Sequence, residues 1–310
     1  MALYLTESDV DALLTIEDAL DAVEASFRRL AGGRVENRPR YRIGLEGGLM
    51  AVMAAADLEL GKAGLKTYTA FGYEEVRFVV LIFDADRAEL VGMIEANRLG
   101  QLRTGAASGV AARYLALPGA KTLGVIGCGF QAETQVAAIR AAVPSIERVV
   151  AYCRTPERLE RFCRAAGAEP AEGHHEAGAQ EIVVTSTTSK DPVLRGDWLG
   201  PGALVCAIGA NDPGARELDN LVLERAAFVC CDSREQSMLE SGDLIDPVAQ
   251  GVLDWLEVHE LQEIVAGELA GRQSDEDIVV FKSNGIAAWD VAVGALALER
   301  AQERGVGVEL

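Results

Sequence analysis

The spacing of hydrophobic positions changes along the chain, and its first third predicts helices followed by an antiparallel sheet. Apolar residues recur at helical spacing over residues 6–33, where Thr15 with Asp18 forms a cap for the second of two helices and Gly32 stops it. Closely spaced strand-like runs then follow with no helix between them, at 38–45, 49–55, 62–71, 77–83 and 89–94. Their order predicts mostly antiparallel pairing.

From residue 120 to residue 284 the pattern changes to an alternation of strands and helices. A helix rich in alanine and glycine, expected over 98–115 with Asn97 as its cap, leads into this part. The expected strands are 122–126, 148–152, 182–186, 203–208, 228–232 and 278–282, and the clearest helices between them are 133–142, 156–166 and 234–240. Such alternation predicts a parallel sheet with helices on both faces. A last helix, 287–304, follows the sheet and is expected to pack on the first part of the chain.

The two patterns together predict an α/β fold with two domains. A chain of 310 residues is too long for one small core and suits two domains of about 150 residues each. Residues 119–285 would form a Rossmann-type doubly wound parallel sheet domain. Residues 1–118 together with 286–310 would form a second, α+β domain.

A glycine-rich turn follows the first strand of the expected parallel sheet. The apolar run that ends at Ile126 leads into Gly127, Gly129 and Ala132 and then into a helical pattern. The first glycine permits a tight turn, the second lets a phosphate approach the backbone, and the small third residue lets helix and strand pack closely. Because N–H groups at a helix N-terminus attract anions, the pattern predicts the pyrophosphate site of a dinucleotide; an ordinary strand–turn–helix is the alternative.

The end of the next strand bears on the choice of nicotinamide cofactor. NAD-binding folds usually carry a carboxylate there for the ribose diol, but this strand ends in Arg154 and Thr155. An arginine and a hydroxyl suit a 2′-phosphate, so the sequence favours NADP(H), with NAD(H) possible. The alternative is a plain surface arginine at a strand end.

Polar residues also end two later strands, at the sheet edge where ligands of doubly wound folds bind. One strand runs into Thr185, Ser186 and Thr187, and the next into Ile208 and Gly209. Hydroxyls at this edge are expected to contact the ribose or the adenine. The alternative is that these residues merely begin turns.

Isolated cations lie in otherwise apolar or small-residue surroundings in the first domain. They are Arg40 or Arg42, Lys66 and Arg103. An isolated lysine in a strand is usually a solvated edge residue. Three cations facing one cleft would instead clamp a substrate carboxylate and supply an amine whose pKa is lowered by neighbouring positive charge.

Charge and composition narrow the range of partners. The net charge is −19 and no basic run exceeds two residues, which argues against nucleic acid or an anionic membrane as a partner. The first dozen residues include acids and do not form a signal peptide, and no apolar run approaches about 20 residues. Six cysteines without a Cys-x-x-Cys pair predict reduced thiols in a cytoplasmic protein. The three histidines lack a suitably spaced third ligand, so no metal site is expected.

Together these motifs resemble the ornithine cyclodeaminase/mu-crystallin family. The matching segments appear in family order over most of the chain: RPRYR near residue 40, MAVMAA near 53, GLKTY at 64–68, LRTGAASGVAARYLA at 102–116, GVIGCGFQA at 124–132, TSTTS at 185–189, IGANDPGARELD at 208–219, ESGDL at 240–244 and FKSNGIAAWDVA at 281–292. The resemblance implies a homodimer in which the α+β domain serves dimerisation and substrate binding. It also implies a nicotinamide cofactor and an α-amino or α-imino acid substrate.

The resemblance further implies roles for individual residues. Lys66 would be the catalytic acid/base, and Arg103 with Arg40 or Arg42 would hold the substrate carboxylate. The other substrate-binding positions would be Met53 and Asn211. The cofactor-binding positions would be Thr104, Gly127, Gly129, Phe130, Gln131 and Ala132 near the pyrophosphate, Arg154 and Thr155 at the adenosine end, and Ser283 and Gly285 at the nicotinamide end, besides Thr185, Ser186, Thr187, Ile208 and Gly209 at the strand ends.

One departure from the family pattern bears on the reaction. In cyclodeaminases this segment resembles Gly-Asp-x-Pro-Gly, and the position of its aspartate corresponds to Asn211 in this chain. An amide cannot take up a proton as a carboxylate does. The sequence therefore favours NAD(P)H-dependent interconversion of an α-imino acid and an L-amino acid, including alanine dehydrogenase activity. One alternative is ornithine cyclodeaminase with bound NAD, in which Asp212 would replace the aspartate. The other is a non-catalytic protein that binds NADPH or another small ligand.

Overall fold

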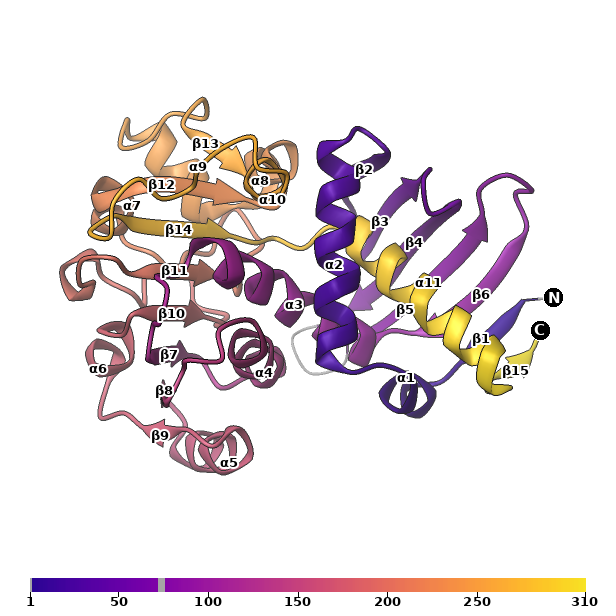
Figure 1. The fold of residues 1–310 in the computed structure, drawn as a ribbon, viewed down its shortest axis with the longest axis horizontal. Helices are drawn as coiled ribbons and strands as arrows, with labels where there is room; N and C mark the ends of the chain where they lie inside the picture. Colours follow the sequence, from indigo (N-terminus) through magenta and orange to yellow (C-terminus); the bar gives the residue numbers. More distant parts are fainter. Residues whose placement is uncertain (1, 72–75) are drawn as a thin grey trace. The chain divides into compact units, whose positions relative to one another are not determined.

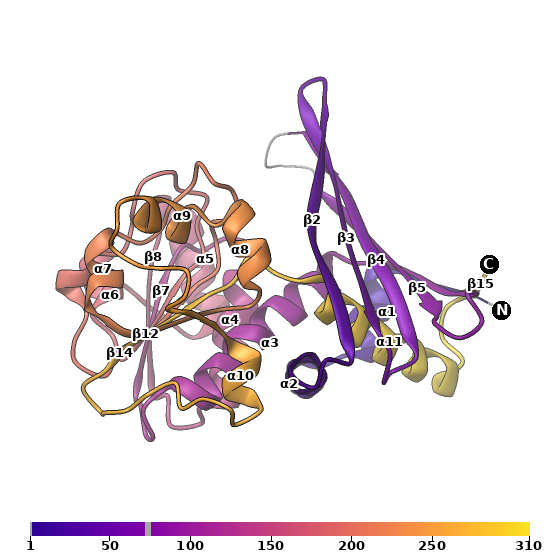
Figure 2. The ribbon, with the colours of Figure 1, turned by 90° about the horizontal axis from the view of Figure 1, so that it is seen from above.

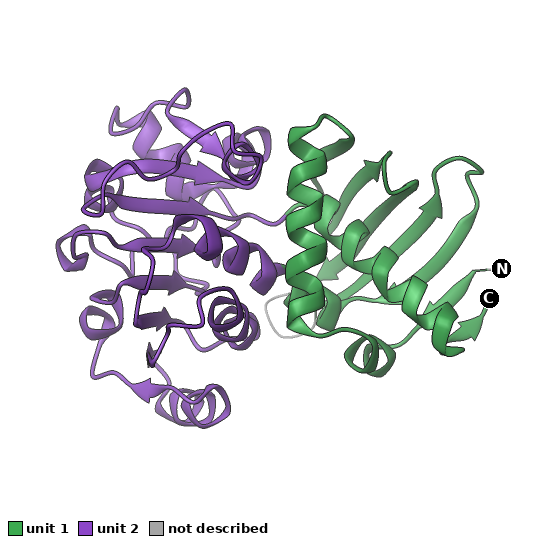
Figure 3. Cartoon of the chain, in the orientation of Figure 1, with its two compact units in different colours: residues 1–103, 286–310 green, residues 104–285 purple. Residues whose placement is uncertain are grey.

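The structure is a computed structural model that describes residues 2–71 and 76–310. The chain separates into two compact units, one ending at residue 103 and resuming over 286–310, the other spanning 104–285 (Figure 3). The expected division after residue 118 lies just past helix α3 (Asn97–Leu115), whereas the two units divide inside this helix. A sequence pattern marks where a helix ends and not where its contacts change, which accounts for the difference.

The first unit is built on a mainly antiparallel sheet. In the described part of the chain its strand order is β15–β1–β6–β5–β4–β3–β2, and only β1 and β6 pair in parallel. The strands are β1 (Leu3–Leu5), β2 (Val35–Leu45), β3 (Gly48–Asp57), β4 (Lys62–Ala70), β5 (Arg77–Asp84), β6 (Leu90–Glu95) and β15 (Val308–Glu309). The five strands expected here are confirmed, and the short strands β1 and β15 are additions that the pattern did not predict.

Helices α1 (Glu7–Leu13), α2 (Ile16–Ala31) and α11 (Ala287–Arg304) belong to the same unit. Thr6 and Thr15 cap the first two helices, each exchanging hydrogen bonds with an aspartate three residues later, as predicted for Thr15. Helix α11 runs across β3, β4 and β5 (Figures 1 and 2). Its Trp289 packs edge-on against Phe27 of α2, with 5.2 Å between ring centroids. The last helix of the chain therefore completes the core of the unit that contains the chain's N-terminal residues.

The start of α3 differs from the prediction. Asn97 is the first residue of the helix, and its side chain accepts a hydrogen bond from the backbone N–H of Phe78. The carboxylate of Glu7 accepts from the N–H groups of Asn97 and Arg98 instead, each at 2.7 Å. The prediction of Asn97 as a cap is wrong because a residue remote in sequence satisfies the first amides and complements the positive end of the helix dipole.

The second unit is a doubly wound parallel sheet with helices on both faces (Figure 2), which confirms the predicted fold class. Across the described residues the strand order is β13–β12–β14–β11–β10–β7–β8–β9, with every pair parallel. The strands are β7 (Thr122–Ile126), β8 (Arg148–Tyr152), β9 (Glu169–Pro170), β10 (Ile182–Thr185), β11 (Leu204–Ala207), β12 (Ala226–Cys231), β13 (Val258–Glu260) and β14 (Ile278–Lys282). The helices are α4 (Ala132–Ala142), α5 (Pro156–Ala166), α6 (His174–Gly178), α7 (Asn220–Arg225), α8 (Arg234–Glu240), α9 (Gly242–Ala249) and α10 (Leu261–Val265), with a 3-10 turn, η1 (Gly196–Trp198).

The strand order of this sheet reverses between β7 and β10. Strands β8 and β9 extend from β7 in one direction, and β10, β11 and β14 extend in the other. Doubly wound sheets bind ligands outside the carboxyl ends of their strands at such a point. The glycine turn after β7 therefore lies where a dinucleotide is expected. None of the helices described for either unit has the length and apolar character needed to span a membrane.

Candidate active site

The glycine turn after β7 has the geometry that a dinucleotide phosphate requires. Gly127 has a φ of +102°, and a Cβ built there would lie 2.3 Å from the carbonyl oxygen of Ser186. A Cβ built at Gly129 would meet nothing within 4 Å, and Ala132 is fully buried where α4 begins. The turn is thus open where a phosphate would approach and tight where helix and strand meet.

A cavity of about 370 Å³ opens beside this turn. Its lining includes six of the predicted cofactor residues: Gly127, Gly129, Arg154, Thr155, Ser186 and Thr187. Sequence reasoning missed other lining residues, among them Tyr152, Arg158 on α5, and His174 on α6. The rings of Tyr152 and His174 meet edge-on at 4.5 Å, and burial, together with the charge of Arg154, lowers the pKa of His174. The strand ends of β7, β8 and β10 therefore meet around one space.

The remaining predicted cofactor residues do not line that cavity. They are Thr104, Phe130, Gln131, Ala132, Thr185, Ile208, Gly209, Ser283 and Gly285. Thr185 is fully buried, and its hydroxyl donates to Glu217 at 3.0 Å. The Ser283 hydroxyl and the Gly285 N–H donate to Asp232 at 2.9 and 2.6 Å. Thr185, Ser283 and Gly285 thus help to hold the strand ends and loops of the unit in place.

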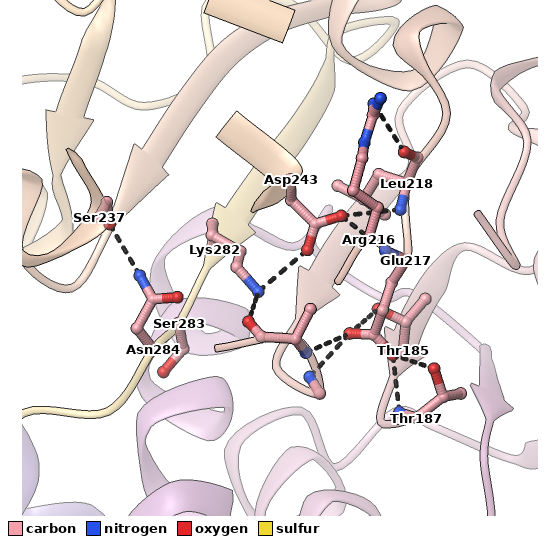
Figure 4. A network of polar contacts seen from close by, with 12 residues as sticks. Thr185, Thr187, Arg216, Glu217, Leu218, Ser237, Asp243, Lys282, Ser283 and Asn284 are labelled. Carbon is pink, nitrogen blue, oxygen red and sulfur yellow. Dashed lines mark hydrogen bonds and ion pairs between the residues drawn. The ribbon is translucent and has the colours of Figure 1, made fainter. Parts of the chain in front are cut away.

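A buried carboxylate ties the loop after β11 to the end of β10 (Figure 4). Glu217 accepts hydrogen bonds from the Thr185 hydroxyl and from both the backbone N–H and the hydroxyl of Thr187. It also accepts from the backbone N–H groups of Gly209 and Ala210 at 2.7 and 3.2 Å. Burial raises the pKa of the Glu217 carboxyl, and the positive charge of Lys282 and the hydrogen bonds from Thr187 oppose that shift.

A second carboxylate and a lysine complete this network. Asp243 accepts from the backbone N–H groups of Glu217 and Leu218 at 2.7 and 2.9 Å, and the Nζ of Lys282 lies 3.0 Å from its other oxygen (Figure 4). Lys282 is fully buried and also donates to the carbonyl of Ala210. Buried charges are costly unless they are paired and hydrogen-bonded, so the network fixes the course of the loop.

The same loop carries the position at which the sequence departs from the cyclodeaminase pattern. Asn211 and Asp212 are both exposed. The Oδ1 of Asp212 accepts the backbone N–H of Gly214 at 2.9 Å, as expected for an aspartate that begins a turn.

In the first unit the structure gathers predicted cations around one lysine. Lys66 on β4 is 3% exposed, Arg40 on β2 is 9% exposed and Arg103 on α3 is 6% exposed. Met53 on β3 lies opposite Lys66 in the sheet, and its sulfur accepts from the Nε of Arg40 at 3.4 Å. The positive charges of Arg40 and Arg103 both act on Lys66, whereas Arg42 is only partly buried. The structure therefore groups Arg40, and not Arg42, with the lysine.

Sequence reasoning missed the acid at the centre of this group. Asp290 on α11 is 1% exposed, and its Oδ1 lies 3.1 Å from the Nε of Arg103 and 3.4 Å from the Nζ of Lys66. The Lys66 ammonium also lies 4.6 Å from the centre of the Phe78 ring. The available signal was a lone acid in the otherwise apolar run 287–298 of the last helix, since unpaired acids are rarely buried.

The surroundings of Lys66 prepare it for proton transfer. Burial and the charges of Arg103 and Arg40 lower its pKa to about 7, and Asp290 opposes that shift. An amine with such a pKa can give or take a proton near neutral pH. Guanidinium groups beside it suit a carboxylate, so the arrangement can perform acid–base chemistry on a carboxylic acid.

Known proteins match this chain over almost its whole length. The family model described as the ornithine cyclodeaminase/mu-crystallin family matches residues 2–305. The alanine dehydrogenase of Archaeoglobus fulgidus is 34% identical, covering 99% of this chain and 98% of its own. The solved structure of Thermococcus litoralis Δ1-pyrroline-2-carboxylate reductase in complex with NADH and L-proline is 32% identical with a TM-score of 0.94, covering 99% of this chain and 100% of that one. An archaeal alanine dehydrogenase dimer with bound NAD is 33% identical with a TM-score of 0.93, covering 100% and 98%.

Proposed function

Because the chain belongs to the ornithine cyclodeaminase/mu-crystallin family, we propose that it is an NAD(P)H-dependent oxidoreductase that interconverts an α-imino acid and an L-amino acid. The observation that carries the proposal is the buried Lys66, whose pKa is lowered to about 7 and which is linked through Asp290 to Arg103. The substrate would be a cyclic imine such as pyrroline-2-carboxylate, or the imine of a keto acid with an amine. Relatives named for these two kinds of reaction support that range.

The residues of the first unit would bind the substrate and move the proton. The guanidinium groups of Arg40 and Arg103 hold the carboxylate, which fixes the imine carbon at a reacting distance. Protonated Lys66 donates its proton to the imine nitrogen, and in the oxidative direction the neutral amine takes that proton back. When bound, the nicotinamide supplies the hydride that the imine carbon receives.

The residues of the second unit fit a nicotinamide dinucleotide. The open space at Gly129 and the tight turn at Gly127 suit the pyrophosphate, with Thr104, Phe130, Gln131 and Ala132 at its edge. The ribose and adenine would lie beside Thr185, Ser186, Thr187, Ile208 and Gly209, and the nicotinamide beside Ser283 and Gly285. The assignments at the pyrophosphate and the nicotinamide follow the family resemblance, and those for the ribose and adenine follow the strand ends around the switch point.

We assign NADP(H) as the preferred form of the cofactor. No carboxylate stands at the end of β8, where Cys153, Arg154 and Thr155 follow the strand; Arg154, Thr155 and Arg158 line the cavity there. The Thr155 hydroxyl makes no cap hydrogen bond to α5, although the residue stands at that helix's N-terminus. Two guanidinium groups, a hydroxyl and a helix N-terminus suit a 2′-phosphate.

We further propose that the chain forms a homodimer through the outer face of the first unit's sheet. Side chains alternate along a strand, so Leu65 points away from the face on which its neighbour Lys66 contacts Asp290 of α11. Leu65 pairs with Leu81 across β4 and β5, and both are partly exposed. An apolar hollow of about 310 Å³ beside Leu65 continues this face to Ala54 and Phe83. Partly exposed apolar faces of this kind mark interaction surfaces, and a similar archaeal relative is known as a dimer.

We place the protein in the cytoplasm. Its six cysteines are free, and thiols stay reduced in that compartment. Five of them are buried, as expected for core residues.

Product analysis tests the reaction class. Purified protein is incubated with pyrroline-2-carboxylate and NADPH, and separately with pyruvate, ammonia and NADPH, while the absorbance of the reduced cofactor is followed. Consumption with formation of L-proline or L-alanine supports the proposal. Proline and ammonia formed from ornithine without net cofactor change would show a cyclodeaminase instead. NADPH binding without either reaction would show a ligand-binding protein.

A further inference from the structure

Asp290 is the only carboxylate among the groups that act on Lys66 from the described elements around it. Arg40 comes from β2, Met53 from β3, the Phe78 ring from β5, and Arg103 from α3. Lys66 and Arg103 therefore share one acid, and Arg40 adds a further positive charge that acts on Lys66. The acid stands on α11, whose buried face is otherwise apolar.

The geometry of Asp290 is unusual for an ion pair that serves only stability. Both cations are within reach of the same oxygen, Oδ1, while Oδ2 is buried without a hydrogen-bond partner among the described residues. A buried ion pair stabilises a fold only when its remaining lone pairs accept hydrogen bonds. Most buried polar atoms in proteins do have a hydrogen-bond partner. The arrangement instead holds the Lys66 ammonium and the Arg103 guanidinium at a fixed separation through one atom, Oδ1 of Asp290.

The charge count of the proposed reaction gives this acid a purpose. With a substrate carboxylate bound and Lys66 neutral, the charges of Arg40, Arg103, Asp290 and the substrate sum to zero. Without Asp290 the same state would carry one positive charge, and a proton on Lys66 would add a second in a buried site. Like charges at such distances oppose protonation strongly.

Resting on the proposed function, we infer that Asp290 is a positioning residue of the imine reaction: one oxygen fixes the Lys66 ammonium against the Arg103 guanidinium, and its charge keeps a proton on Lys66 available for the imine nitrogen. Asp290 also accepts the Nε–H of Arg103 at 3.1 Å, which holds the guanidinium that would bind the substrate carboxylate. The pKa of Lys66 supports this role, because Asp290 raises that pKa while burial, Arg103 and Arg40 lower it.

The test is the pH dependence of kcat/KM in both directions for Asp290→Asn. The amide keeps the size of the side chain and removes its charge, so the pKa of Lys66 should fall by about 1–3 units. In imine reduction Lys66 must be protonated, so the alkaline limb of the profile should move to lower pH by that amount. In amino-acid oxidation Lys66 must be neutral, so the acid limb should move to lower pH as well. A purely structural defect would lower activity without moving either limb.

Asp57→Asn is the matched control. Asp57 is equally buried in the same unit, where it pairs with Arg29 at 2.7 Å, and it lies outside the group around Lys66. Its variant should keep both limbs where wild type has them. If Asp290→Asn destabilises the fold, Asp290→Ser replaces it in the test. Its side chain is smaller and also uncharged, so the limbs of its pH profile should move in the same direction.

The outcomes separate this inference from the proposed function. If wild type is active and the pH profiles of Asp290→Asn and Asp290→Ser have their limbs at the wild-type pH values, the role of Asp290 is overturned and the proposed function stands. A wild type that reduces no imine overturns the proposed function itself. Limbs that move to lower pH in both directions, with Asp57→Asn unchanged, establish the positioning role.

Discussion

Met53 lies directly opposite Lys66 in the antiparallel pairing of β3 with β4, and its sulfur accepts the hydrogen bond of Arg40. The methionine thus places Arg40, the proposed ligand of the substrate carboxylate, next to the proposed acid. Met53→Leu keeps the volume of the side chain but removes the acceptor. We expect KM for the imine to rise about two- to tenfold with kcat little changed, as loss of one hydrogen bond predicts. Met50→Leu, on the same strand, is the control, and a KM equal to wild type in Met53→Leu would contradict this role.

The cofactor assignment predicts a selective loss of affinity. Arg154→Ala and Arg158→Ala should each raise Kd for NADPH by about 10- to 100-fold, because each removes charge-assisted hydrogen bonds to the 2′-phosphate. NADH lacks that phosphate, so its Kd should change little. Fluorescence titration with both cofactors measures the difference. The control is Arg164→Ala, which changes an exposed arginine on α5, the helix that carries Arg158. Arg164 pairs with Glu160, and its variant should leave both affinities unchanged. Equal losses for the two cofactors would exclude the 2′-phosphate assignment.

The proposed dimer predicts a change of molecular mass in solution. Leu81→Arg places a charge on the outer face of the first unit's sheet, where burial against a second copy would be costly. We expect wild type to run as a dimer in light scattering and this variant as a monomer with a native circular dichroism spectrum. Leu256→Arg changes a leucine that is 82% exposed in the second unit and should leave the mass unchanged. A Leu81→Arg protein that keeps the wild-type mass would move the interface elsewhere.

The lowered pKa of Lys66 predicts how stability depends on pH. Its pKa is about 7 in the folded chain and about 10.5 in the unfolded one, so the unfolded state binds more protons between those values. Stability should therefore rise with pH across this window. Relative to Lys66→Met, wild type should gain at least about 1 kcal/mol in its free energy of unfolding between about pH 7 and pH 10. Denaturant titrations measure this difference, and Lys62→Met, a half-buried lysine of the same strand, should not reproduce it. A constant difference between wild type and Lys66→Met would show that Lys66 keeps its ordinary pKa.

Much of the fold could be predicted because its signals are local. Strand and helix periods, the Thr15 cap and the turn at Gly127 each depend on residues close together in sequence, and the structure contains all of them. The cap of α3 could not be predicted, since Glu7 reaches it from 90 positions away. The short strands β1 and β15 depend likewise on pairing with remote partners.

The candidate site was predictable only in part, for the same reason. Lys66 and Arg103 stood out as cations in apolar surroundings. The lone acid in the apolar run of the last helix indicated a buried carboxylate at Asp290, but not that Lys66 and Arg103 would be its partners. The contacts between Glu217, Asp243 and Lys282 also span three distant segments. A pattern identifies residue types suited to chemistry, whereas the topology decides which of them meet.

The most direct test of the central claim is single-turnover reduction of pyrroline-2-carboxylate by NADPH-loaded protein. Wild type and Lys66→Met are compared near pH 7, with Lys62→Met as the control and NADPH affinity measured for all three. If Lys66 protonates the imine nitrogen, Lys66→Met should bind NADPH as wild type does but reduce the imine about 10²- to 10⁴-fold more slowly. A Lys66→Met protein that reduces the imine at the wild-type rate would contradict the account.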